Sequence, residues 1–203
     1  NYSYIDSIRE AEKVLVSEMN GTLYTIAKDV KFQVEFNPEL VSEYRLIGYE
    51  NRLMKDEDFY DDTKDAGEIG SGHTVTAMYE IVPVSAELPL KYQSSEEKPA
   101  AEGEYSDELL TVSIKYKAPD SDESETLKFP VKKDEFTEFP SENMQFASCV
   151  AEFGMLLRNS EYINNEVSYK DICQTLAGLD SIYDDDYKSE FADLVKTVSK
   201  YSS

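Results

Sequence analysis

Clustered acidic side chains are the first residues of this chain that could do chemistry, because carboxylate oxygens are ligands that suit calcium. An EF-hand loop needs Gly at its sixth position and Glu at its twelfth. Neither requirement is met in the loops that begin at Asp56, Asp61, Asp120 or Asp184. We therefore expect solvated turns and helix caps, and weak calcium binding stays as an alternative. Its candidate ligands are Asp61, Asp62 and Asp65.

A second candidate is the glycine-rich stretch 67–73, which ends at the only histidine of the chain, His73. A catalytic triad or a Cys–His pair would have to use this one imidazole, and a zinc site would lack ligands near it. The spacing Gly-x-x-Gly-x-Gly leads into a strand pattern rather than a helix, unlike a phosphate-binding loop. We predict a tight turn that forms a binding edge. Its candidate binding residues are Gly67, Gly70, Ser71, Gly72 and His73.

The charge balance excludes some partners. Twenty basic residues face forty-two acidic ones, so the net charge is −22. A field of that sign repels phosphate backbones and anionic lipid, so we expect no nucleic-acid binding. No stretch approaches the roughly twenty apolar residues of a membrane span. Nothing selects a catalytic pair among the acids, so a carboxylate-based hydrolase is kept only as an alternative to a non-catalytic module.

Residues 1–20 predict one amphipathic helix, with Ser7 and Glu10 as its capping box and Asn20-Gly21 as its end. The chain starts with Asn1 rather than Met, and we expect the natural partner of the apolar face upstream. The apolar residues at helical spacing are Ile5, Ile8, Ala11, Leu15 and Met19.

The middle of the chain has the two-residue period of strands. From Val30 to Phe36, apolar residues alternate with polar ones, so one face is expected in the core and the other in water. Strands are predicted at 44–51 and 73–82, the latter apolar on both faces and therefore central. A hairpin joins 110–117 to 126–131. The acidic segment 55–65 is predicted to be a loop, and 86–107 has the composition of a mobile connection.

After Pro140 the period returns to 3.6, and the apolar stripes predict three helices, at 146–157, 172–179 and 187–201. Cys149 and Cys173 fall within the first two of these, and we expect both to be buried and reduced, with a single disulfide bridge as the alternative. The fold class is α+β: an antiparallel, sandwich-like β domain at 21–140 and a helical subdomain at 141–203, preceded by the helix of 1–20.

Several long segments of the sequence, taken in the same order along the chain, resemble those of a known protein family. Residues 1–20 resemble the last strand edge and C-terminal helix of a von Willebrand factor type A (VWA) domain, and the remainder resembles the C-terminal region of the YfbK-type bacterial VWA proteins. The strings that carry the resemblance are 25–31, 33–38, 44–52, 65–70, 72–80, 153–158 and 160–162.

The resemblance implies an extracytoplasmic bacterial protein, often a lipoprotein, whose VWA domain carries a metal site of the form Asp-x-Ser-x-Ser. That motif is missing here, since the nearest string, 122–126, follows Pro119 in a polar turn. We therefore expect no cofactor in this chain, and a divalent cation only in the VWA domain. The resulting expectation is a non-catalytic module that packs beside an upstream VWA domain and contacts an unknown protein partner. Its recognition edge would be the glycine turn with the segment 55–65.

Overall fold

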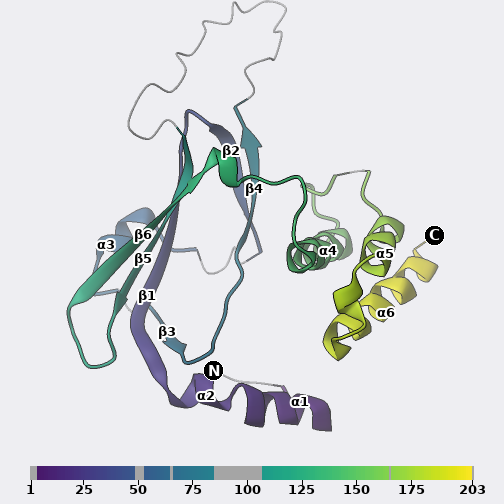
Figure 1. The fold of residues 1–203 in the computed structure, drawn as a ribbon, viewed down its shortest axis with the longest axis horizontal. Helices are drawn as coiled ribbons and strands as arrows, with labels where there is room; N and C mark the ends of the chain where they lie inside the picture. Colours follow the sequence, from purple (N-terminus) through teal and green to yellow (C-terminus); the bar gives the residue numbers. More distant parts are fainter. Residues whose placement is uncertain (1–3, 49–52, 65, 85–106, 165, 203) are drawn as a thin grey trace, which may run out of the picture. The chain divides into compact units, whose positions relative to one another are not determined.

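The structure is a computed structural model that describes residues 4–48, 53–64, 66–84, 107–164 and 166–202 (Figure 1). It confirms the predicted α+β class. The chain divides into two compact units, Asn1–Phe136 and Thr137–Ser203. The predicted mobile connection 86–107 lies outside the described residues except for its last residue. None of the helices within the described ranges is both long and apolar enough to cross a bilayer.

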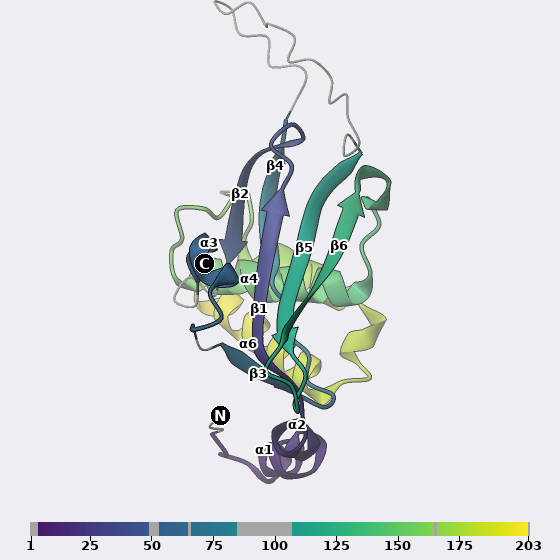
Figure 2. The same ribbon diagram turned by 90° about the vertical axis from the view of Figure 1, so that its left-hand side faces the viewer.

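An antiparallel four-stranded sheet forms the centre of the first unit, in the order β3-β1-β5-β6 (Figure 2). The hairpin of β5 and β6 was predicted, and it follows from alternating apolar residues on either side of a polar turn. The strands are β1 (Thr25–Phe36), β3 (Gly67–Gly70), β5 (Glu108–Lys117) and β6 (Ser124–Lys132).

The strand predicted at 73–82 is shorter and less buried than expected. β4 spans Met78–Pro83 and pairs with β2, Val41–Ile47, in a separate two-stranded sheet. The central position belongs instead to β1 and β5, each of which has a partner on both sides. The two sheets meet at aromatic rings, since Phe36 stacks on Tyr44 with centroids 4.3 Å apart.

The N-terminal helix is interrupted, contrary to the single helix predicted. α1 (Ile8–Glu12) leads into a π-helical turn, Lys13–Ser17, and then α2 (Met19–Leu23). Ser7 caps α1 by accepting a hydrogen bond from the Glu10 amide at 3.1 Å. Gly21 does not end the helix but lies inside α2, where its carbonyl approaches Gly70 of β3. Gly70 has no side chain, which allows the backbone of α2 to come close to β3.

The acidic segment is also partly helical rather than a loop. α3 spans Asp56–Tyr60, and its first turn holds three acids, Asp56, Glu57 and Asp58. Negative charge stabilises a helix N-terminus because the backbone amides there carry partial positive charge. The segment was predicted to be a loop because it lacks a periodic apolar pattern, but its acidic residues favour a short helix.

The second unit contains the three predicted helices, α4 (Glu142–Leu157), α5 (Tyr169–Ala177) and α6 (Asp186–Tyr201). Ser168 and Asp171 form a capping box at the start of α5, and Asp185 caps α6. Two short 3-10 turns, Lys133–Glu135 and Asp180–Ile182, precede α4 and α6. The core of the unit consists of Cys149, Phe153, Ile172, Leu176, Leu179, Ile182 and Val195.

Candidate functional site

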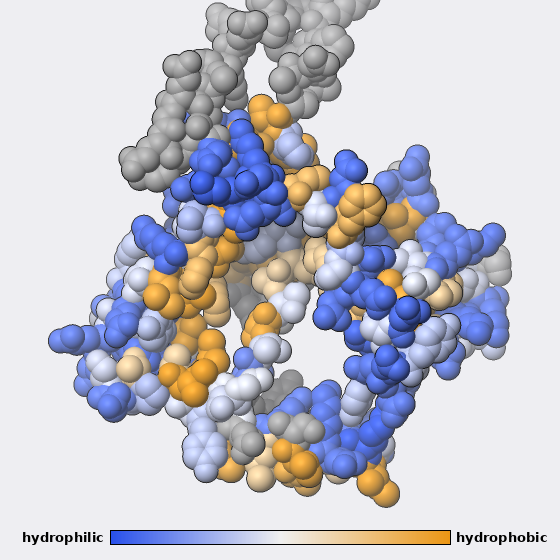
Figure 3. All heavy atoms as spheres, in the orientation of Figure 1, coloured by the Kyte–Doolittle hydropathy of each residue, from blue (hydrophilic) through white to orange (hydrophobic). Residues whose placement is uncertain are grey.

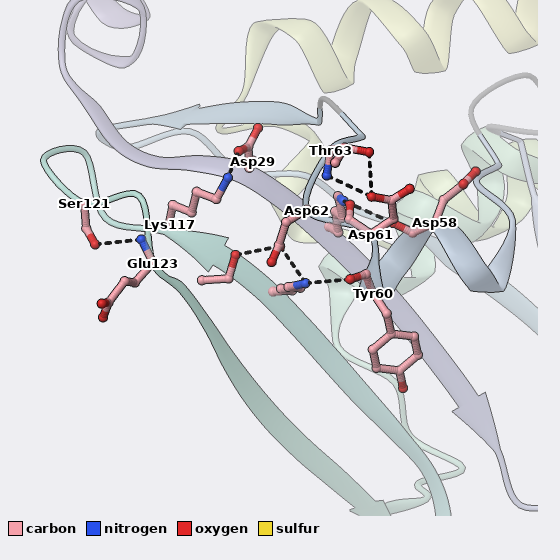
Figure 4. A network of polar contacts seen from close by, with 12 residues as sticks. Asp29, Asp58, Tyr60, Asp61, Asp62, Thr63, Lys117, Ser121 and Glu123 are labelled. Carbon is pink, nitrogen blue, oxygen red and sulfur yellow. Dashed lines mark hydrogen bonds and ion pairs between the residues drawn. The ribbon is translucent and has the colours of Figure 1, made fainter.

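The end of α3 is fixed to the four-stranded sheet by lysine side chains (Figure 4). Lys31 of β1 donates hydrogen bonds from Nζ to the carbonyl of Asp58, at 3.1 Å, and to that of Asp61. The last carbonyls of a helix have no partner within it, and a cation there also offsets the negative end of the helix dipole. Lys31 is only 2% exposed, so these contacts compensate for the burial of its charge.

Lys115 of β5 completes the attachment. It lies opposite Lys31 in the β1–β5 register, and its Nζ donates to the carbonyl of Tyr60, at 3.3 Å. The same ammonium forms an ion pair of 2.7 Å with the Asp62 carboxylate, which also accepts the Ser124 hydroxyl at 2.8 Å. The hydrogen bond from Lys115 lowers the pKa of Asp62, and that from Ser124 lowers it further. We call Lys31, Lys115 and Asp62 the lysine latch.

A third lysine pairs with an acid at a bulge in β1. Lys117 and Asp29 form an ion pair of 2.6 Å. Asp29 has a φ of +49° where the β1–β5 register shifts, an arrangement that resembles a bulge with its first residue in the left-handed region. The hydrogen bond from Lys117 holds the pKa of Asp29 below its usual value. Sequence reasoning missed all three lysines. Their one signal was their place on the polar face of strands in a chain with forty-two acidic residues and only twenty basic ones.

The structure assigns separate roles to the predicted calcium ligands. Asp61 accepts hydrogen bonds from the Thr63 amide at 2.9 Å and the Thr63 hydroxyl at 2.6 Å, which lowers its pKa and closes a local turn. Asp62 belongs to the lysine latch, and Asp65 lies outside the described residues. In the described ranges, no three acidic, histidine or cysteine side chains are grouped so that they could hold a metal ion.

The predicted glycine turn is displaced within its stretch. Gly67 and Gly70 are the ends of strand β3, whereas the turn itself is at Ser71 and Gly72. Gly72 has a φ of +77°, and the His73 amide donates to the Gly70 carbonyl at 3.1 Å. Ser71, Gly72 and His73 are exposed. The structure brings these three together at one turn, and their binding role stays a prediction.

The two faces of the sheet reverse the predicted burial at its centre. Lys31, expected in water, is buried under α3, whereas the neighbouring Phe32, expected in the core, is 56% exposed. Ser113, on the same polar face as Lys31, is buried as well. Val30 and Phe36, at the ends of the predicted segment, are buried as expected. The prediction failed at Lys31 and Phe32 because alternation identifies two faces but not which of them is covered at each point.

The opposite face carries nine apolar residues in register, which we call the apolar grid. Its β6 members Leu127 and Phe129 are 44% and 49% exposed. Figure 3 shows apolar side chains gathered over these strands and over the N-terminal helix. The three rows of the grid are Phe32-Ile114-Leu127, Val34-Val112-Phe129 and Phe36-Leu110-Val131.

The N-terminal helical segment has a second uncovered apolar surface. Ile8 of α1 is 89% exposed, and the π-helical turn and α2 add further exposed apolar residues. Large apolar side chains that recur on one side of a helix normally pack against another element. The exposed members that we call the N-terminal stripe are Ile5, Ile8, Leu15 and Met19.

The helical unit contains two groups with raised pKa values. Burial raises the pKa of the Cys149 thiol to about 11, so this thiol is an inert core group. Cys149 and Cys173 are both free thiols, as predicted, but Cys173 is only half-buried. Burial also raises the pKa of Glu152, with a smaller contribution from Asp171.

Comparisons with known proteins agree on one family. No solved structure matches the chain. It is 40% identical over 197 residues to "Uncharacterized protein YfbK" of Escherichia coli (strain K12), an alignment that covers 97% of this chain and 34% of the relative. This chain therefore spans about a third of the length of the curated relative that it matches. The family described as "Uncharacterized protein YfbK, C-terminal" matches residues 21–201. Because this match covers most of the chain, the protein belongs to the family of YfbK C-terminal regions.

Proposed function

We propose that this chain is a non-catalytic accessory module of a bacterial cell-envelope VWA protein, and that it makes protein-protein contacts beside an upstream VWA domain. The observation that carries the proposal is the uncovered N-terminal stripe. Residues before 21 precede the match to the family, yet the alignment with the relative covers nearly the whole chain. A helix in that position, with its apolar side exposed, suits the junction between two domains.

The chemistry of the acidic residues supports a non-catalytic role. A carboxylate hydrolase needs an acid whose pKa is raised toward neutrality. Ion pairs and hydrogen bonds lower the pKa values of Asp29 at the bulge and Asp62 in the lysine latch, and hydrogen bonds from Thr63 lower that of Asp61. These groups hold the fold together in their ionised form. The raised pKa of Glu152 has a structural cause, because this carboxylate is half-buried in α4 one turn after the core residue Cys149.

Hydrogen exchange can test the domain contact. The amides of residues 4–23 are compared in this chain alone and in the longer protein with its natural upstream region. We expect exchange to slow at least tenfold in the longer protein, because a helix whose apolar side is packed opens less often. Amides of α6 provide the internal control and should not change.

Substitutions in the N-terminal stripe show whether the slower exchange in the longer protein comes from packing of the stripe or only from the greater length of the chain. The double variant Ile8→Asp/Leu15→Asp should abolish the slower exchange in the longer protein, whereas Glu12→Gln, on the same segment, should retain it. Equal exchange of residues 4–23 in the short and the longer proteins would refute the proposed contact with the upstream domain.

A further inference from the structure

The apolar grid is a second surface, separate from the N-terminal stripe, and three of its nine side chains are exposed. A sheet normally buries its apolar face against another layer. Here α3 and the lysine latch cover the polar face instead, and Phe32, Leu127 and Phe129 are left open. Nine apolar side chains in three in-register rows are too regular to be scattered surface residues.

The ends of the apolar grid are different in character. At one end, Phe36 is closed off by ring contacts with Tyr44 and Tyr79, at 4.3 and 5.4 Å between centroids. At the other end, the β5–β6 turn carries exposed acids, and the Tyr116 hydroxyl donates to Glu125 at 2.8 Å. The exposed acids of the turn are Asp120, Asp122 and Glu123.

The size of the apolar grid indicates what could cover it. Strands about 4.8 Å apart and rows about 6.8 Å apart give a footprint of about 14 by 20 Å with the width of the side chains included. A stable dimer buries about 800 Å² on each partner, far more than this footprint. One α-helix about 10 Å wide and about 13 residues long would match it.

We propose that the apolar grid binds an amphipathic α-helix of a separate protein, with its apolar side on the rows and basic residues on its polar side. The acids at the turn and the net charge of −22 favour a basic partner over an acidic one. Some of the basic residues of the helix lie next to the acidic residues of the β5–β6 turn. This surface is distinct from the one that joins the upstream domain, so each proposal can fail without the other.

A peptide can probe the apolar grid directly. The probe is a 14-residue helical peptide with Leu at positions i, i+3, i+4, i+7 and i+11 and Lys at the remaining positions, labelled for fluorescence anisotropy. We expect saturable binding to the full chain, and at least tenfold weaker binding of a peptide with Glu in place of Lys. A peptide of the same composition with its five Leu at i, i+2, i+4, i+6 and i+8 should also bind at least tenfold more weakly, because it cannot present a helical stripe.

Matched variants on β6 assign the binding to one face of the sheet. Leu127→Thr/Phe129→Thr should weaken binding of the Lys peptide at least tenfold, since Thr keeps strand propensity but removes apolar surface. Lys128→Thr, on the opposite face, should change it less than twofold. If the double variant does not fold, methyl NMR of the unmodified chain replaces it, with shifts on peptide addition expected at Val112 and Val131.

Three results would overturn the proposal: no binding at millimolar peptide, equal binding to both variants, or binding without methyl shifts at the apolar grid. Light scattering distinguishes the other occupants. A concentration-dependent dimer that is lost in Leu127→Thr/Phe129→Thr would assign the face to a second copy of this chain. Methyl NOEs from the apolar grid to other residues of the same chain, without any peptide and in a strict monomer, would assign it to another part of that chain.

Discussion

At the residue scale, Lys31 is a buried cation that serves as a structural donor. Its ammonium group donates hydrogen bonds to two carbonyls at the end of α3. Lys31 also lies opposite Lys115 on the neighbouring strand, and within the described residues it forms no ion pair with a carboxylate. Two like charges on neighbouring strands are unfavourable unless each has its own acceptors. Here the carbonyls and Asp62 supply them. Lysine on a strand thus acts as a side-chain cap for a distant helix.

Replacing this lysine should destabilise the first unit. We expect Lys31→Met to lower the free energy of unfolding by about 1–3 kcal/mol, because the α3 carbonyls lose their donor while the methionine retains most of the packing. Urea denaturation followed by tyrosine fluorescence measures the change. The control is Lys128→Met, which alters an exposed lysine on the same sheet face, and its effect should be within about 0.5 kcal/mol. Equal stability of the two variants would show that the lysine latch contributes nothing.

At the element scale, a contact between two glycines joins α2 to β3. A Cβ added at Gly70 would lie 1.4 Å from the Gly21 carbonyl oxygen, a distance that backbone atoms cannot tolerate. At Gly67, the other end of the same strand, an added Cβ would meet nothing within 4 Å. The two ends of β3 therefore differ sharply in their tolerance of a methyl group.

This difference gives a matched pair of substitutions. Gly70→Ala should lower the free energy of unfolding by about 2 kcal/mol or more, since α2 or β3 must move. Gly67→Ala should be neutral or stabilise by up to about 1 kcal/mol, because alanine reduces the freedom of the unfolded chain. Chemical denaturation of both variants would test this. A neutral Gly70→Ala would mean that α2 does not pack on β3 as described.

The sequence predicted some of these elements better than others. The hairpin β5–β6 and the helices α4 to α6 were predicted because their periodicity is long and uninterrupted. The predictions for 55–65 and 73–82 were wrong in part. The loop at 55–65 is partly helical because α3 is stabilised by its helix dipole and by donors from Lys31 and Lys115, which are distant in the sequence. The lysine latch could not be predicted for the same reason, because its contacts join residues that are far apart in the sequence and local residue spacing does not indicate them.

On the scale of the whole molecule, the two units have separate means of stabilisation. The helical unit holds a continuous core of seven buried residues and capped helices. The sheet unit combines strand register and polar contacts around α3 with a small set of buried apolar residues, Val30, Phe36, Val41 and Phe59. A separate core is the usual condition for folding alone.

We therefore expect the fragment 137–203 to fold by itself. Its circular dichroism should show helix, and its thermal unfolding should be cooperative, although domains of this size are only marginally stable. The substitution Val195→Asp, at a fully buried position, should abolish the transition, whereas Lys196→Asp, at an exposed one, should preserve it. A helical signal that fades gradually with temperature in the unmodified fragment would contradict an independent core.

The two edges of the four-stranded sheet have a consequence for solubility. An open edge can add strands from other chains and so start aggregation. β3, at one edge, is only four residues long, and β6, at the other, contains Pro130 between Lys128 and Lys132. Proline lacks an amide donor, and lysine charges repel a second copy of the same strand. Both edges of the four-stranded sheet therefore resist the addition of a strand from another chain, although apolar side chains are exposed on one of its faces.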